Sequence, residues 1–334
     1  MTRMILVVTA IALLAIGGYF AINYQVETQY ENGRVAAVTI TPRAAASDAS
    51  PGETPIASAA RAAKPTFRMA TFDLGGLDES KLGSLRISDV LLRLLPRFEL
   101  IALEGIRGKN QGVLVRLVEQ INAASGRQYT FATCPTQRRD GVEHYSAFVF
   151  DRAALEVDQA TVHFVEDPLG RFRHRPLAGA FRVRGLDPAL AFTFVLIAVD
   201  TNPDNPGPEL DLLADVIRAV RKKMPGEDDI IMLGDFQADD NHLGGLNGIL
   251  GITAAISGTP TTTRGTQLAD NILFDRRATV EFTGRAEVVD LIREFDLTID
   301  QARDISEHLP VWAEFSSYEG GQKGYVPPAT PKKP

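Results

Sequence analysis

Acidic side chains follow one apolar run after another in this chain, at the points where strands are expected to end. They are Asp73, Glu104, Asp200 and Asp235, followed by the pairs Asp270-Asn271 and Glu307-His308 beside later runs. Oxygen ligands from separate strand ends are what a Mg²⁺ or Mn²⁺ site needs. Such an ion can polarise a phosphoryl oxygen and help to deprotonate a water molecule. One strand-end carboxylate is ordinary, but the series with its adjacent histidine indicates metal-assisted chemistry.

The clearest positioning element is the apolar run Ile230-Ile231-Met232-Leu233, which follows the acidic turn Glu227-Asp228-Asp229 and ends at Gly234. The run predicts a short buried strand that carries Asp235 at its C-terminal edge. Open α/β sheets bind ligands at such edges, because side chains from several strands converge there on a rigid frame.

Between residues 66 and 316, strand-like and helix-like segments alternate. Strands are predicted at 67–73, 100–103, 129–133, 147–150, 157–164, 178–183, 192–199, 230–235, 271–274, 280–282 and 311–315, and helices at 87–95, 113–121 and 210–220. Many strands with only a few long helices favour two packed mixed sheets flanked by helices over an all-parallel sheet.

The segments outside this domain differ in composition. Residues 1–30 contain a charge-free run at 4–22 that is long enough to span a bilayer as a helix, so we predict an uncleaved membrane anchor. A cleaved signal peptide would have a shorter apolar core and a small-residue cleavage site soon after it. Arg3 before the run and Glu27 and Glu31 after it favour a soluble domain on the non-cytoplasmic side.

Two further segments are poor in apolar periodicity. Residues 31–65 are rich in Ala, Pro, Ser and Thr and predict a flexible linker, and residues 317–334 predict a disordered tail. The net charge of −7 excludes a global basic field for nucleic acid. The single cysteine, Cys134, excludes an intramolecular disulfide and a cysteine-based zinc site.

The order of these motifs resembles the endonuclease/exonuclease/phosphatase superfamily, which has the DNase I-like fold, over about residues 67–315. The resemblance is carried by Ala102-Leu103-Glu104, Leu233-Gly234-Asp235-Phe236-Gln237, Arg264-Gly265-Thr266, Asp270-Asn271-Ile272-Leu273 and Ser306-Glu307-His308-Leu309-Pro310-Val311. It implies a four-layer α/β/β/α sandwich of two mixed sheets. It also implies metal-dependent hydrolysis of phosphoester bonds, in nucleic acids or in smaller phosphodiesters.

The same resemblance assigns the central roles. Glu104 would be the principal ligand of a Mg²⁺ or Mn²⁺ ion, with Asp73 and Glu307 nearby. Asp235 would orient the attacking water, and His308 would contact the scissile phosphate or act as its acid–base partner.

Supporting roles follow in the same way. Arg175 resembles the phosphate-proximal arginine of the family, and Asp270 and Asn271 would support the site. Tyr145 would be the tyrosine on the phosphate side, although the spacing Tyr145-Ser146-Ala147-Phe148 is one residue longer than usual, so that Ser146 could take its place.

Four positions depart from the family pattern. Asp73 stands for an asparagine, Gln237 for an asparagine and Glu307 for an aspartate. Asp200 replaces a histidine, and this change is the largest, because a carboxylate has neither the near-neutral pKa of imidazole nor its donor pair.

Two hypotheses remain open. The first is a monomeric, membrane-tethered, metal-dependent phosphodiesterase or nuclease, and the second is a catalytically inactive domain that serves as a binding or scaffold module. We favour the first, because the substituted residues stay polar and mostly chemically related. His163 and His174 are predicted to be surface or strand residues, and His144 and His242, which lie nearer the expected crevice, are predicted to be bystanders.

Overall fold

The computed structural model describes residues 24–31, 34–42, 66–108, 110–134, 137–139 and 142–321. The run at residues 4–22 lies outside these ranges, as do residues 43–65 of the predicted linker and 322–334 of the predicted tail. Among the helices that the structure describes, none combines the length and the apolar character that crossing a bilayer requires.

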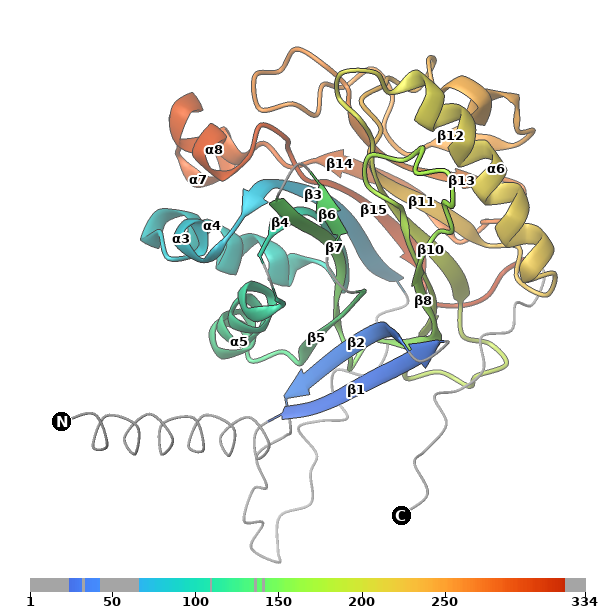
Figure 1. Ribbon diagram of the computed structural model, residues 1–334, viewed down its shortest axis with the longest axis horizontal. Helices are drawn as coiled ribbons and strands as arrows, with labels where there is room; N and C mark the ends of the chain where they lie inside the picture. The colour runs from blue at the N-terminus through green and yellow to red at the C-terminus, as the bar shows by residue number, and fades with distance from the viewer. Residues whose placement is uncertain are drawn as a thin grey trace, which may run out of the picture.

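Two mixed β-sheets stand face to face in the centre of the molecule (Figure 1). The first has the order β1-β2-β5-β7-β4-β3-β15-β14, with β6 paired to β7 outside this path. Its strands are β1 (Tyr24–Glu31), β2 (Arg34–Pro42), β3 (Thr66–Leu77), β4 (Leu100–Arg107), β5 (Tyr129–Thr133), β6 (Gln137–Arg139), β7 (Val142–Asp151), β14 (Phe282–Val288) and β15 (Val311–Ser316). The second has the order β12-β13-β11-β10-β9-β8. Its strands are β8 (Leu155–Phe164), β9 (Leu177–Val183), β10 (Thr193–Asp200), β11 (Ile230–Asp235), β12 (Ile252–Ala254) and β13 (Asp270–Asp275).

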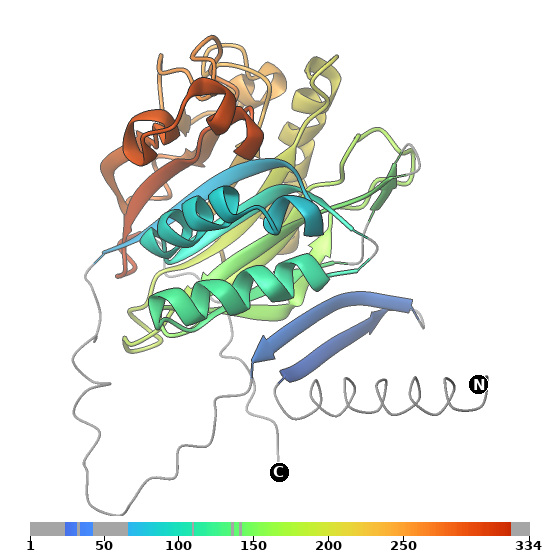
Figure 2. The same ribbon diagram turned by 90° about the vertical axis from the view of Figure 1, so that its left-hand side faces the viewer.

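Helices cover the outer faces of the two sheets (Figure 2). The first sheet carries α3 (Glu79–Leu82), α4 (Leu85–Leu94), the 3-10 helix η1 (Leu95–Arg97), α5 (Gly112–Ser125), α7 (Leu291–Phe295) and α8 (Ile299–Ile305). The second carries α6 (Gly207–Lys223) and the 3-10 helix η2 (Gly244–Gly248). Apolar side chains fill the space between the sheets and the space under each helical layer. The predicted pair of mixed sheets flanked by helices is therefore confirmed.

The central strands are buried on both faces, which explains why they appear as continuous apolar runs in the sequence. In β4, Ile101 and Leu103 pack under the helices, whereas Leu100 and Ala102 pack against the second sheet. This alternation follows from the two-residue period of a strand. Phenylalanines dominate the space between the sheets, where the ring centroid of Phe194 lies within 5.9 Å of those of three other phenylalanines.

The structure differs from the sequence-based prediction at both ends of the domain. Strands β1 and β2 form an antiparallel pair that joins β5, so residues 34–42 are a strand where a flexible linker was predicted. At the other end, Ser317 is buried and its carbonyl oxygen accepts a hydrogen bond from the backbone N–H of Phe192. The folded domain therefore extends beyond residue 316, and the prediction of disorder from 317 was wrong for residues 317–321.

The sequence-based prediction also missed several short elements, among them α7 and α8. Short helices have too few turns to show an apolar period, so their caps are the better signal. Helix α8 begins with a capping box in which Thr298 and Gln301 bond each other's backbone N–H groups. Asp290 caps α7 by accepting from two backbone N–H groups.

Candidate active site

Strand pairing brings the predicted carboxylates together at one edge of the two sheets. Asp73 lies opposite Glu104 in the parallel pair β3–β4, and Asp200 lies opposite Asp235 in the parallel pair β10–β11. Asp270 lies opposite Asp235 in the antiparallel pair β11–β13. By the two-residue period, each of these residues continues the strand face that packs between the sheets. The crevice at this edge is therefore lined from both sheets.

Gly234 allows β10 and β11 to approach closely just before Asp235. Its φ of 134° is one that side-chain-bearing residues rarely adopt, and a Cβ atom there would lie 2.0 Å from the carbonyl oxygen of Val199. Only glycine fits between these strands without forcing them apart. The register Asp200–Asp235 depends on this contact.

Glu104 and Asp73 form the carboxylate pair on the first sheet. Glu104 is fully buried, and both of its oxygens accept from the hydroxyl of Thr71, at 3.1 and 3.2 Å. Burial, followed by the charges of Asp73 and Asp200, raises the pKa of Glu104 well above its usual value. Burial and the charge of Asp200 also raise the pKa of Asp73, whose Oδ1 accepts from the backbone N–H of Gly75 at 2.7 Å.

These carboxylates fit a divalent cation. They offer hard oxygen ligands, they repel one another, and no lysine or arginine that the structure describes forms an ion pair with Glu104, Asp73 or Asp235. A cation between them would reverse the cost of burying like charges.

Asp235 is held in place by the residue that follows its strand. Gln237 donates its backbone N–H to Asp235 Oδ1 at 2.9 Å and its side-chain amide to Oδ2 at 2.6 Å. This double contact requires a φ of 48° at Gln237, which is uncommon for a residue other than glycine. The amide of Gln237 thus fixes the direction of the Asp235 carboxylate, and its extra methylene is accommodated by the turn.

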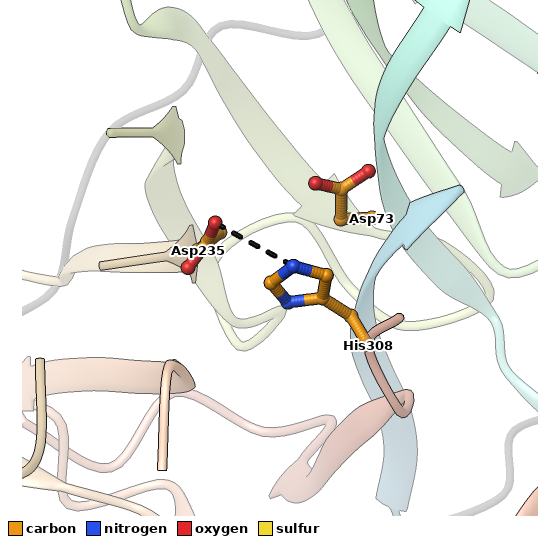
Figure 3. A group of neighbouring side chains, drawn as sticks. All are labelled: Asp73, Asp235 and His308. Atoms are coloured by element: carbon orange, nitrogen blue, oxygen red, sulfur yellow. Dashed lines mark ion pairs between the residues drawn. The ribbon is translucent and has the colours of Figure 1, made fainter. Parts of the chain in front are cut away.

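His308 faces Asp235 and Asp73 from the loop before β15, as Figure 3 shows. Its Nδ1 lies 2.9 Å from Asp270 Oδ2, and its Nε2 lies 3.9 Å from Asp235 Oδ2. The same Asp270 oxygen accepts from the hydroxyl of Thr261 at 2.9 Å. Burial alone would lower the pKa of His308, but Asp270 and then Asp235 outweigh it and raise the pKa to about 11. His308 is therefore a fixed cation at the edge of the carboxylate group.

Other predicted site residues lie apart from this crevice. Glu307 is half exposed, and its carboxylate is held by Arg303, whose Nε and terminal nitrogen approach to 2.9 and 2.5 Å. This contact lowers the pKa of Glu307, and Glu307 is not among the converging side chains Asp73, Asp235 and His308, so the structure does not support its predicted role as a metal ligand. The exposed guanidinium of Arg175 lies 5.0 Å above the ring of Phe164, whereas Arg173 donates to the side-chain oxygen of Asn202, two residues after Asp200, at 3.3 Å.

Asn271 and Tyr145 have structural contacts. The buried amide of Asn271 donates to the carbonyl oxygen of Ile256 at 2.8 Å and accepts from its N–H at 3.1 Å, so Asn271 fixes the loop beside β13. The hydroxyl of Tyr145 donates to the carbonyl oxygen of Asn110 at 3.3 Å, toward α5. These contacts engage the Asn271 amide and the Tyr145 hydroxyl with backbone groups and not with the carboxylates.

Sequence reasoning missed a second histidine–aspartate pair beside the first. His174 Nδ1 lies 2.8 Å from Asp200 Oδ2, an ion pair without the angle of a hydrogen bond, and its ring stacks on His144 at 5.2 Å. These three residues line a small polar pocket with Tyr145 and Ser146. Burial lowers the pKa of His174, but the contacts with Asp200 raise it overall, whereas burial and His174 lower the pKa of His144.

The signal for His174 was available in the register of two predicted strands. Ala198 pairs with Leu177 in the antiparallel strands β10 and β9, so residues just before Leu177 must lie beside the end of β10. His174 stands three residues before Leu177, next to Asp200. This placement supports neither the prediction of His174 as a surface or strand residue nor that of His144 as a bystander.

No family model matches the chain. It is 26% identical over 194 residues to Deoxyribonuclease-1-like 2 of Homo sapiens, covering 53% of this chain and 64% of that protein. It is 26% identical over 261 residues to Deoxyribonuclease-1-like 1 of Sus scrofa, covering 75% of this chain and 81% of that protein.

Solved structures give the same fold. A conserved protein of unknown function from Enterococcus faecalis superposes with a TM-score of 0.53 at 15% identity, over 75% of this chain and 99% of that one. An endonuclease/exonuclease/phosphatase family protein from Leptotrichia buccalis superposes with a TM-score of 0.53 at 13% identity, with the same coverage of 75% and 99%.

The close approach at Gly234 predicts the effect of adding one methyl group. We expect Gly234→Ala to lower the free energy of unfolding by on the order of 3 kcal/mol, because the new Cβ overlaps the Val199 carbonyl and the backbone is strained. Urea denaturation of the variant measures this. Gly226→Ala, in the exposed turn before β11 with no atom near its Cβ, is the control and should change the value by less than about 0.5 kcal/mol. Equal effects of the two substitutions would contradict the argument.

Proposed function

We propose that this chain, a divergent member of the endonuclease/exonuclease/phosphatase superfamily with the DNase I-like fold, is a divalent-metal-dependent phosphodiesterase. The observation that carries the proposal is the convergence of Glu104, Asp73 and Asp235 beside the pair Asp270–His308. The similarity to deoxyribonucleases supports a nucleic-acid phosphodiester as substrate, and a smaller phosphodiester is the alternative.

Glu104 and Asp73 are the residues that would hold the cation, with Mg²⁺ or Mn²⁺ favoured by an oxygen-only ligand set. When bound, the ion would supply Lewis-acid polarisation of a phosphoryl oxygen. Thr71 holds Glu104 from behind, which keeps its carboxylate directed at the crevice.

Two further residues act on the attacking water and on the charge of the phosphoryl group. Asp235, fixed by Gln237, orients the attacking water and takes its proton as the new oxygen–phosphorus bond forms. His308, held as a cation by Asp270, stabilises the charge that develops on the phosphoryl oxygens. The bond from phosphorus to the leaving oxygen breaks, and that oxygen requires a proton.

The pair His174–Asp200 is our candidate for this proton donor. It stands at the edge of the second sheet next to Asp235, because Asp200 and Asp235 are paired in register. Asp200 stabilises the protonated imidazole of His174 and so keeps His174 in the form that can donate a proton. The aspartate found at the family's histidine position would thus act through a neighbouring histidine.

We further propose that residues 4–22 anchor the enzyme in a membrane, with the phosphodiesterase domain on the non-cytoplasmic side. The length of this charge-free run and the charges around it support the proposal.

Metal-dependent activity is the first expected outcome. The full-length chain, purified in mild detergent, should nick plasmid DNA and cleave bis-(p-nitrophenyl) phosphate with Mg²⁺ or Mn²⁺, and EDTA should stop both reactions. Glu104→Gln should abolish this turnover because it removes the buried ligand charge, whereas Glu287→Gln, on the exposed face of β14, should retain it. A wild-type chain that is folded but inactive with either metal and both substrates would instead support the inactive binding module.

A double-mutant cycle tests the second pair. His174→Ala should lower kcat by about 10²- to 10⁴-fold, and Asp200→Asn should lower it as well, because each removes the same proton donor. The double variant should then be no worse than His174→Ala alone. In wild type, activity should fall as the pH rises through the pKa of His174, and this alkaline limb should change in both variants.

His242→Ala provides a matched control, because His242 and Asp239 form an equally short pair of 2.8 Å on the exposed surface. Its kcat should stay within about two-fold of wild type. Additive losses in the cycle, or an unchanged pH profile in His174→Ala, would exclude His174 as the proton donor.

Membrane attachment is tested in cells that express the full chain. The protein should stay with the membrane pellet after alkaline carbonate washing, and a version lacking residues 1–22, which keeps β1, should be released. Protease added to the non-cytoplasmic face should degrade the domain. Release of the full chain by carbonate would refute the anchor.

A further inference from the structure

A second group of carboxylates lies at the end of the sheets opposite the candidate active site. Asp229 directly precedes β11, which ends at Asp235, so the two residues stand about 20 Å apart on the same face of one strand. Glu281 precedes β14 of the other sheet, and Glu319 follows β15. One oxygen from each of Asp229, Glu281 and Glu319 lies within 4.8 Å of the others. We name these three residues the distal carboxylate cluster.

The cluster contains buried oxygens that have no partner. Asp229 has no exposed surface, yet neither of its carboxylate oxygens forms a hydrogen bond within the described structure. Glu281 is 2% exposed and its Oε2 is also unpartnered, as is Glu319 Oε1, and the hydroxyl of Thr279 faces Asp229. Buried polar groups are nearly always satisfied, so these oxygens indicate a missing ligand.

The other oxygens of the cluster are firmly held. Glu281 Oε1 accepts from the backbone N–H of Gly320 at 2.6 Å, and Glu319 Oε2 accepts from that of Thr193 at 3.2 Å. Each glutamate is therefore fixed through one oxygen and leaves the other free. Both oxygens of Glu227 accept hydrogen bonds, one from the hydroxyl of Thr193 and one from the backbone N–H of Asp229. Glu227 therefore holds the cluster in place without offering it a free oxygen.

Negative charge in the cluster is not balanced by the protein. Among the described residues, no lysine or arginine forms an ion pair with Asp229, Glu281 or Glu319. Burial and the charge of Glu281 raise the pKa of Asp229 to about 9, and burial raises that of Glu319 to about 7. Without a cation, the cluster must hold protons or bear the repulsion.

We propose that Asp229, Glu281 and Glu319 bind a divalent cation, Ca²⁺ in preference to Mg²⁺, at this end of the molecule. Both oxygens of Asp229, one of each glutamate and the Thr279 hydroxyl provide five oxygen ligands, without nitrogen or sulfur. Ca²⁺ accepts six to eight oxygens in irregular geometry, whereas Mg²⁺ demands a near-ideal octahedron. The ion joins β11 of the second sheet, the start of β14 in the first sheet and the segment after β15, so its role is to stabilise the fold.

The test is thermal unfolding of the full-length chain, stripped of metal with EDTA and then titrated with CaCl₂ or MgCl₂ at pH 8. Glu104→Gln serves as the background, because it weakens metal binding at the active-site carboxylates and leaves the distal carboxylate cluster intact. In this background, Ca²⁺ at about 100 times its Kd should raise Tm by roughly 5–10 °C, and Mg²⁺ at the same concentration should raise it less.

Asp229→Asn, added to that background, should remove the Ca²⁺-dependent rise. In EDTA at pH 8 its Tm should stay close to that of the background, because the amide is uncharged, as the protonated Asp229 carboxyl is at that pH. Glu319→Gln is the second variant, because it lies on the partly exposed C-terminal segment and is less demanding for folding.

Calorimetry completes the test. The Glu104→Gln chain should bind one Ca²⁺ with release of protons, and both cluster variants should lose this binding. A rise in Tm that persists in both cluster variants, or no Ca²⁺ binding by the Glu104→Gln chain, would overturn the proposal. Neither result depends on turnover, so the phosphodiesterase proposal stands or falls separately.

Discussion

The burial of like charges between the two sheets is the constraint on which the rest of this structure depends. Along most of their length the sheets are joined by apolar side chains, with phenylalanine rings in the middle. On this face of β11, a buried aspartate stands at each end of the strand: Asp229 just before it and Asp235 at its last position. Desolvation raises the pKa of both carboxyl groups, so each end of the sandwich favours a bound cation, a proton or a neighbouring imidazolium.

The two ends satisfy this constraint in different ways. At the candidate active site, backbone N–H groups, the Gln237 amide and the cation of His308 surround the carboxylates, and Asp73, Asp200 and His308 are only partly buried. At the opposite end the free oxygens are closed in, and the chain supplies no positive group among its described residues. An open site with movable protons suits catalysis, whereas a closed oxygen cage suits a permanent ion.

The layered fold and the main carboxylates could be predicted from the sequence because both depend on local patterns. Continuous apolar runs mark strands buried on both faces, and a polar residue where a run ends marks the edge, as Asp235 does after β11. Glu307 shows the limit: it was predicted to stand near Glu104 as a metal ligand, but Arg303, one helical turn earlier in α8, binds its carboxylate. That competition depends on a short helix that has no apolar period to reveal it. The position of the Arg175 guanidinium likewise depends on its contact with the ring of Phe164, which the sequence does not reveal.

The aspartate at position 200 is the clearest case in which the residue alone misleads and its neighbours explain it. Considered by itself, Asp200 removes an imidazole from the expected place. The antiparallel register of β9 and β10 returns one, because His174 comes from the loop before β9 and its Nδ1 reaches Asp200. Asp200 forms an ion pair with His174 as Asp270 does with His308, so each histidine has a carboxylate partner from the second sheet. A histidine–carboxylate pair can thus form although the histidine comes from another strand end than expected, since the chemistry requires the two groups to be adjacent and leaves their order along the chain free.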